Sequence, residues 1–302
     1  MARTSLRVFV CVVYESYNLL NPNMSSIEDT MENVFHDFPE LPCELSKENL
    51  HKKRLVIEER IYSILKSKYM LKLKEFWSSY TVPRQSDRCI VIVERRIHPN
   101  LEFILYNAAY FARGWSIAIV CSDVNVDYIK GILGHNLEQV HLIQMFKGNP
   151  NPDVGKNEYN YLLQESRFYS ALPSENLLMM EMDTYLRKPI PDTIFQYDYV
   201  AAPYAWDETM SGGGLSFRKR SKMLEICSTY RYRESAQDVY ASKGMNMIGA
   251  SVPSFEESLE YFCESCLYED PIGLHQWWTF FSLNIQEDDY VYMQYMTLEM
   301  LD

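Results

Sequence analysis

Two apolar stretches of the sequence end in charged side chains whose types suit metal and nucleotide chemistry. One stretch leads into Glu94 and Arg96, and the other carries Glu181 and is followed by Asp183. Unpaired carboxylates at the end of a buried strand are unfavourable, and a hard divalent cation with oxygen ligands pairs them well. Because alternate residues on a strand point to the same side, we expect one of Glu181 and Asp183 to bind a metal and the other to hold a ribose or a water. Solvent-exposed turn carboxylates are the alternative interpretation.

A glycine-rich segment, 211–218, offers a second kind of chemistry. Its three consecutive glycines, Gly212, Gly213 and Gly214, permit a backbone path that is closed to residues with a Cβ. Such a turn lets main-chain N–H groups approach a sugar or phosphate closely, and Arg218 can then bind an oxygen anion through its forked guanidinium. A flexible hairpin explains the same glycines, so both interpretations stay open.

Two later residues could supply an acid and a metal ligand. Asp238 stands near the start of a predicted helix, where its charge either satisfies the helix dipole or takes part in chemistry. His275 lies between a Pro/Gly turn and two tryptophans, and is either a packed core residue or a ligand. Cys263 and Cys266 form a CxxC with no second pair at zinc spacing, which disfavours a zinc or redox role.

The elements that must position these residues alternate between strands and helices. Continuous apolar runs predict strands at 89–94, 116–121, 140–145, 177–182 and 199–202, and a further one at 8–14. Helical spacing predicts helices at 46–77, 100–113, 126–133 and 158–170, with a loop at 148–156. This alternation indicates an α/β fold with a mostly parallel central sheet and helices on both faces, whose ligand lies beyond the carboxyl ends of the strands. We expect residues 1–80 to form an N-terminal extension with a long helix, and residues 81–302 to form the catalytic domain.

Bulk composition narrows the class of partner and the compartment. The net charge of −12 disfavours nucleic acid, whose phosphates an acidic surface repels. No apolar run reaches the length of about 18 residues that a membrane span needs. The seven cysteines are odd in number, and Cys11, Cys89 and Cys121 sit in apolar runs, which favours a reducing compartment.

The order of these segments carries a resemblance. The stretch 89–278 resembles a family, found in bacteria and large DNA viruses, that is known as a domain of unknown function and regarded as a group of glycosyltransferases. Through it the chain is similar to metal-dependent glycosyltransferases of the A-type, Rossmann-like fold. The matching segments are 92–99, 159–162, 178–184, 197–203, 212–218, 237–240, 255–256 and 273–275.

The resemblance implies a role for each candidate residue. Asp183 looks like the metal-binding carboxylate of the Asp-x-Asp motif, His275 like a late histidine that completes the Mn²⁺ or Mg²⁺ site, and Asp238 like the general base. The residues expected to contact the nucleotide-sugar are Glu94, Arg96, Glu181, Gly213, Gly214 and Arg218. The implied activity moves a sugar from a nucleotide-sugar to a hydroxyl of a glycan or protein, in the cytoplasm, or in the host cytoplasm if the protein is viral.

Three positions depart from the family pattern and keep other functions open. Glu181 replaces the first Asp of the motif, Gln237 stands where relatives have Glu, and Gly212 where they often have Asn. One alternative is a non-catalytic nucleotide- or sugar-binding module with a decayed site. Another is a different metal-dependent phosphoryl-transfer enzyme, although aspartyl-phosphate phosphatases need a nucleophilic Asp where Glu181 stands.

Overall fold

A computed structural model describes residues 47–148, 152–205, 207–231, 233–234, 236–266, 268 and 270–278. The strand expected at 8–14 lies outside these residues. By its contacts the chain divides into two units, and among the described residues 47–61 and Trp278 belong to the first and 62–277 to the second. The boundary falls inside the long helix α3 (Lys47–Ser79), which confirms the helix expected at 46–77. The division at residue 80 stays a prediction, and everything below concerns the second unit.

The second unit is built on a mixed sheet, which confirms the expected α/β class. Its strands are β1 (Arg88–Val93), β2 (Ser116–Ser122), β3 (His141–Phe146), β4 (Asn176–Met180), β6 (Tyr199–Tyr204) and β7 (Asp207–Lys219). The strand order is β3-β2-β1-β4-β7-β6, in which β7 pairs antiparallel with both neighbours and the remaining pairs are parallel. The sheet is therefore mostly parallel, and β1, β2 and β4 are buried on both faces as their continuous apolar runs predict.

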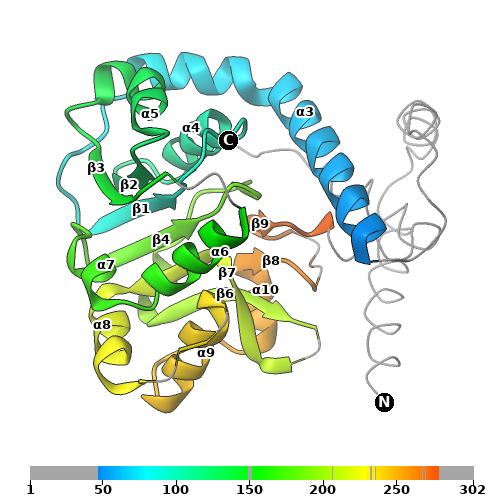
Figure 1. Ribbon diagram of the computed structural model, residues 1–302, viewed down its shortest axis with the longest axis vertical. Helices are drawn as coiled ribbons and strands as arrows, with labels where there is room; N and C mark the ends of the chain where they lie inside the picture. Colours follow the sequence, from blue (N-terminus) through cyan, green and yellow to red (C-terminus); the bar gives the residue numbers. More distant parts are fainter. Residues whose placement is uncertain are drawn as a thin grey trace. The chain divides into compact units, whose positions relative to one another are not determined.

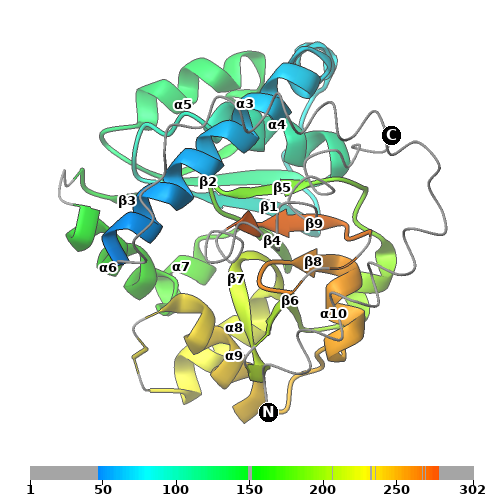
Figure 2. The ribbon, with the colours of Figure 1, turned by 90° about the vertical axis from the view of Figure 1, so that its right-hand side faces the viewer.

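The connections between the parallel strands reverse direction beside β1. The chain passes from β1 through α4 (Leu101–Phe111) to β2, and through α5 (Val126–Leu133) to β3. It then returns through α6 (Pro152–Leu162) and α7 (Ser166–Ser170) to β4, on the other side of β1. Because parallel crossovers are right-handed, the two directions place helices on opposite faces, as Figure 2 shows for α4 and α5 against α7. The carboxyl ends of β1 and β4 flank the point where the order reverses, where α/β sheets bind ligands.

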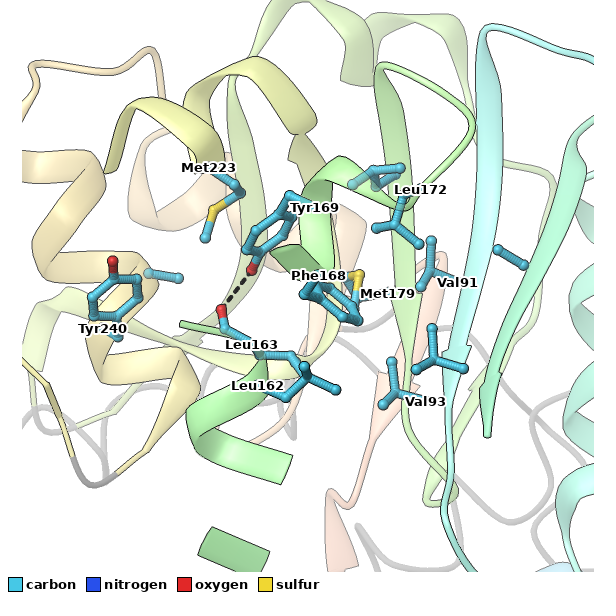
Figure 3. Close-up of a cluster of buried hydrophobic side chains, with 14 of the residues drawn as sticks. Val91, Val93, Leu162, Leu163, Phe168, Tyr169, Leu172, Met179, Met223 and Tyr240 are labelled. Carbon is cyan, nitrogen blue, oxygen red and sulfur yellow. Dashed lines mark hydrogen bonds between the residues drawn. The ribbon is translucent and has the colours of Figure 1, made fainter. Parts of the chain in front are cut away.

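One face of the sheet carries a hydrophobic core under the later helices. Val91, Val93 and Met179 from the sheet pack with residues of α6 to α9, among them Phe168 and Tyr169 (Figure 3). The remaining helices are α8 (Arg220–Thr229), α9 (Gln237–Met247) and α10 (Phe255–Tyr261), with 3₁₀ turns at Gly134–Asn136 and Asp192–Gln196. Burial of these apolar side chains fixes the faces of the helices, so the start of each helix is held at a defined place beside the sheet.

The connection between β3 and β4 differs from the sequence prediction. The expected loop at 148–156 is wrong for its second half, because α6 already begins at Pro152, and proline is well suited to a first helical turn. The expected helix at 158–170 is two helices, α6 and α7. The chain breaks where the Tyr169 hydroxyl donates to the Leu163 carbonyl oxygen at 2.9 Å and the backbone N–H of Glu165 bonds to Leu162 three residues back (Figure 3).

A second, small sheet was missed by the sequence analysis. It consists of β5 (Thr184–Leu186), β9 (Gly273–His275) and β8 (Phe262–Cys263), in the order β5-β9-β8. Figure 1 labels β8 and β9, and Figure 2 labels all three strands. The antiparallel pairing of β5 with β9 sets Thr184 opposite His275. This register brings Thr184, shortly after β4, next to His275, which is 91 positions later in the sequence.

The described residues also bear on compartment and membrane. No helix in this part of the chain is long and apolar enough to cross a membrane. Five cysteines carry free thiols, Cys89, Cys121, Cys227, Cys263 and Cys266. The CxxC pair is thus unbridged, and Cys263 donates weakly to the Leu259 carbonyl oxygen.

Candidate metal site

Two carboxylates and an imidazole converge beyond the end of β4. Glu181 and Asp183 follow β4 directly, and His275 ends β9. One ligand atom from each lies within 4.8 Å of the others. His275 Nε2 stands 3.4 Å from Asp183 Oδ1 and 4.0 Å from Glu181 Oε2. The expected meeting of Asp183 with His275 is confirmed, and the β5–β9 pairing causes it.

A fourth residue, Glu264, orients the imidazole. Its Oε2 lies 3.0 Å from His275 Nδ1, and both side chains are 4% exposed. Gln276 donates from Nε2 to Glu264 Oε1 at 3.1 Å and has a positive φ of 28°, an unfavourable backbone conformation for glutamine. A carboxylate on one ring nitrogen leaves the other nitrogen for a cation, the usual arrangement around histidine ligands of metals.

The donor set fits a divalent cation. Both ring nitrogens of His275 and Glu264 Oε2 are buried and make no hydrogen bond of ordinary geometry with any described residue. Buried polar atoms in folded proteins are nearly always paired, and the 3.0 Å approach of Glu264 Oε2 to Nδ1 leaves Nε2 as the atom that calls for a further partner. Three carboxylates, those of Glu181, Asp183 and Glu264, surround the ring. Two oxygen donors and one nitrogen donor suit a hard or borderline divalent ion.

The electrostatics of the cluster point the same way. Burial, together with the neighbouring charge of Asp183, raises the pKa of Glu181 to about 7, against the lowering effect of His275 and of the Tyr159 hydroxyl that donates to it at 2.6 Å. Burial alone would lower the pKa of His275, but the carboxylates of Glu264 and Asp183 outweigh it and raise that pKa well above its usual range. Without a cation, the carboxylates of this cluster therefore favour bound protons on Glu181 and His275.

Metal binding should compete with protons at this site. A group whose pKa is raised holds its proton more tightly, so Glu181 and His275 must each release one before both can bind a cation. We expect the Kd for Mn²⁺ to fall roughly tenfold or more per pH unit as the pH rises towards 7, because at least one proton leaves per metal bound. Calorimetric titrations in buffers of different ionisation enthalpy would detect the released protons, and an affinity independent of pH would contradict the cluster as metal ligand.

The three glycines make room for polar side chains, which corrects the expectation for Gly213 and Gly214. The segment is not a turn but the middle of β7. A Cβ at Gly214 would overlap the His275 ring, and one at Gly212 would overlap the Glu264 carboxylate. A Cβ at Gly213 would meet Gln237 on the opposite face. Close packing of these side chains against the strand, and not the approach of a ligand, explains the glycines.

Gly214→Ala should therefore weaken metal binding. The added methyl displaces the His275 ring, and changes around a metal ligand typically reduce metal affinity 10- to 100-fold. Overpacking of this kind also destabilises by about 1–3 kcal/mol, which a denaturant titration would measure. The matched control is Gly131→Ala in α5, where an added Cβ meets nothing within 4 Å. Equal Mn²⁺ affinity in both variants would show that the position of His275 does not matter for metal binding.

Arg218 does not face a ligand, and the contact expected from the sequence is wrong. Its side chain is fully buried because β7 continues past the glycines and turns it under α9. The guanidinium donates to the carbonyl oxygen of Gly213 at 3.1 Å, to Gln237 Oε1 at 2.6 Å and to the Tyr169 hydroxyl at 3.2 Å. Arg218 thus links Gln237, the first residue of α9, to the glycine-rich strand through hydrogen bonds.

At the end of β1, Glu94 and Arg96 form a forked ion pair. Arg96 donates from Nε and Nη2 to the two carboxylate oxygens of Glu94 at 2.9 and 2.8 Å, and its backbone N–H adds a third bond at 2.7 Å. Glu94 is 4% exposed and Arg96 56%. Asn125, at the start of α5, donates to the carbonyl oxygens of both residues. The pair lies beyond the end of β1, with Glu94 buried and Arg96 exposed. Its contact with a nucleotide stays a prediction.

Asp238 lies close to the metal cluster, in the first turn of α9. The Tyr204 hydroxyl donates to its Oδ2 at 2.5 Å, and the Val239 N–H donates to its Oδ1 at 2.7 Å. Its charge contributes to the raised pKa of Glu181. Burial and the carboxylates of Glu264 and Asp238 also raise the pKa of Tyr204, so this hydroxyl remains a donor. The charge of Asp238 is thus felt at Glu181, and its role as the acid stays a prediction.

The sequence analysis missed Glu264 and Tyr159 as members of the site. Glu264 follows the buried strand β8, so a carboxylate directly after the apolar pair 262–263 was the available signal. Tyr159 lies on α6 and donates to Glu181, which helical spacing alone does not reveal. Only the pairing of β8 and β5 with β9 brings Glu264 to His275.

Part of the chain matches a known family model. Residues 145–275 match a family whose description reads "protein of unknown function (DUF5672)". The matched stretch contains Glu181, Asp183, Asp238, Glu264 and His275, and leaves Glu94 and Arg96 outside. No curated protein matches the sequence.

Proposed function

We propose that the protein is a glycosyltransferase of the A-type fold that uses Mn²⁺ or Mg²⁺ and moves a sugar from a nucleotide-sugar to a hydroxyl acceptor. The observation that carries the proposal is the cluster of Glu181, Asp183 and His275 at the carboxyl end of β4. The cluster stands beside the point between β1 and β4 where the strand order reverses, which is where a nucleotide would lie. The free thiols of the described residues fit a cytoplasmic enzyme.

The metal would be held by Asp183 and His275, with Glu181 as a further oxygen donor. The chemistry that a metal bound there would supply is neutralisation of the charge that develops on the leaving diphosphate. Mn²⁺ suits the set better than Mg²⁺, since imidazole nitrogen is a poor ligand for the harder ion. Glu264 holds the imidazole so that Nε2 faces the carboxylates.

The remaining steps belong to the side chains of the chain itself. Glu94 and Arg96 hold the nucleotide at the end of β1. Asp238 accepts the proton of the acceptor hydroxyl while the bond between the sugar carbon and the diphosphate oxygen breaks and the new carbon–oxygen bond forms. The nucleoside diphosphate leaves with the bonding electron pair. This role of Asp238 belongs to a reaction that inverts configuration, and in a retaining reaction Asp238 positions the substrate.

A panel of nucleotide-sugars with and without Mn²⁺ tests the proposal. We expect one class of donor to stabilise the protein only when Mn²⁺ is present, and to release nucleoside diphosphate slowly with water as acceptor. A donor at 100 times its Kd should add about 2.7 kcal/mol of stability. Phosphate release without sugar release would favour a phosphoryl-transfer enzyme, and binding without any turnover a non-catalytic module. Absence of binding across the panel would contradict all three.

A further inference from the structure

A pocket of about 80 Å³ is lined by residues of β6, β7, α9 and the start of α10. Its lining includes three residues that carry hydroxyl groups, Tyr199, Ser211 and Ser242, and three apolar residues, Met210, Val252 and Phe255. The pocket is distinct from the metal cluster. Its lining includes residues of the segments 197–203, 211–218 and 255–256, to none of which the sequence analysis assigned an acceptor site.

Helix α9 connects this pocket with Asp238. Ser242 follows Asp238 by four residues and Met245 by seven, so the three lie on one face of the helix. Ser242 is therefore about 6 Å along the helix axis from Asp238. Strand β6 makes the same connection, because Tyr204 at its end donates to Asp238 and Tyr199 at its start lines the pocket. The pocket and Asp238 are therefore built on the same helix and the same strand.

The hydroxyl of Tyr199 marks the pocket as a polar binding site. Tyr199 is 3% exposed. Its hydroxyl lies near those of Ser211 and Ser242, yet makes no hydrogen bond of ordinary geometry with any described residue. The two serine hydroxyls are 3.3 Å apart. Because a buried hydroxyl without a partner is unfavourable, a ligand with its own hydroxyl groups suits Tyr199 and the two serines.

We propose that this pocket binds a carbohydrate acceptor. A sugar ring has an apolar face of C–H groups and a rim of hydroxyls, which match the apolar residues and the hydroxyl-bearing residues of the lining. One hydroxyl of the bound sugar then reaches Asp238, the proposed base. Because the edge strand β6 lines the pocket, a Ser/Thr-rich peptide that pairs with this edge is the alternative that the experiment below decides. The inference rests on the proposed function, since it assigns the acceptor of that reaction.

Val252→Trp should fill the pocket. Val252 is 43% exposed, so the larger ring is accommodated at the rim without disturbing the core. Met247→Trp is the matched control, because Met247 is 49% exposed on α9 and does not line the pocket. Ser242→Ala is a second variant that removes one hydroxyl without adding volume. The probes are methyl glycosides of glucose, galactose and N-acetylglucosamine, titrated against the full chain by ligand-observed NMR.

We expect at least one glycoside to bind the unmodified protein. Its Kd should rise about 10-fold or more in Val252→Trp and several-fold in Ser242→Ala, and should be unchanged in Met247→Trp. The donor-dependent stabilisation in Mn²⁺ should be the same in all three variants. The inference is overturned if no glycoside binds, if both pocket variants bind the glycoside with the same Kd as the unmodified protein, or if a Ser/Thr-rich peptide binds there instead. Loss of the donor effect in the unmodified protein would contradict the proposed function, whereas glycoside binding is measured without donor and decides the pocket separately.

Discussion

Asp183→Ala should abolish the stabilisation that Mn²⁺ and a nucleotide-sugar confer together. Asp183 Oδ1 is the carboxylate oxygen nearest to His275 Nε2, at 3.4 Å against 4.0 Å for Glu181 Oε2. Its removal leaves one carboxylate and the imidazole, so we expect Mn²⁺ affinity to fall by at least about 100-fold, beyond the effect of changing an outer-shell group. A thermal-shift titration at a donor concentration that adds about 2.7 kcal/mol to the unmodified protein would detect the loss.

Asp192→Ala is the matched control for this experiment. Asp192 is another aspartate of the second unit, 80% exposed, and its ion pair with Arg88 lies on the surface. Exposed pairs contribute about 0–1 kcal/mol, so this variant should keep both the fold and the metal response. Retention of the metal-dependent stabilisation by Asp183→Ala, with the control also unchanged, would remove Asp183 from the metal site.

Asp238→Asn should reduce sugar transfer about 100- to 10,000-fold while leaving metal binding intact. The amide has the shape of the carboxylate and can still accept the bond from Tyr204, but it cannot take a proton. General base catalysis typically contributes a factor of this size. Transfer rates with saturating donor and acceptor, measured beside the Kd for Mn²⁺, separate the two effects.

Tyr204→Phe provides the comparison for Asp238→Asn. It removes the hydroxyl that donates to Asp238 at 2.5 Å and leaves the carboxylate in place. We expect a smaller loss than for Asp238→Asn, since the base is retained but less well positioned. An Asp238→Asn enzyme that transfers sugar at an unchanged rate would show that Asp238 is not the base.

The sequence was most informative where burial on both faces leaves a continuous apolar run. The strands at 89–94, 116–121 and 177–182 were found within two residues at each end. Their helical connections follow from the same pattern, because an α/β alternation allows few other arrangements. Once the parallel sheet was inferred, the carboxyl ends of its strands directed attention to Glu94 and Asp183.

Strand β7 shows where local reading failed. Three glycines have low strand propensity, and by themselves they predict a turn. In the structure they continue β7, because His275 and Glu264 occupy the space above Gly214 and Gly212, and Gln237 the space at Gly213. The lack of a Cβ at each glycine leaves space for side chains that are distant in the sequence. The misplacement of Arg218 followed from the same error, since a residue after a turn is expected to be exposed.

The small sheet could not be predicted from local patterns. Strands β5, β8 and β9 have three, two and three residues, too few for any periodicity to appear. Their pairing nevertheless fixes His275 beside Asp183 and Glu264 beside His275. The meeting of Asp183 with His275 was inferred from a resemblance, and Glu264, for which no motif existed, was missed.

A crystal grown with Mn²⁺ and examined by anomalous scattering tests the metal site most directly. We predict one strong peak beyond the end of β4, within about 2.0–2.4 Å of an Asp183 oxygen and His275 Nε2, the range of metal–ligand bonds of this type. His275 Nδ1 should remain on Glu264. A His275 ring that stays bound to Asp183 in saturating Mn²⁺, with no peak between them, would contradict a metal-binding role for this cluster.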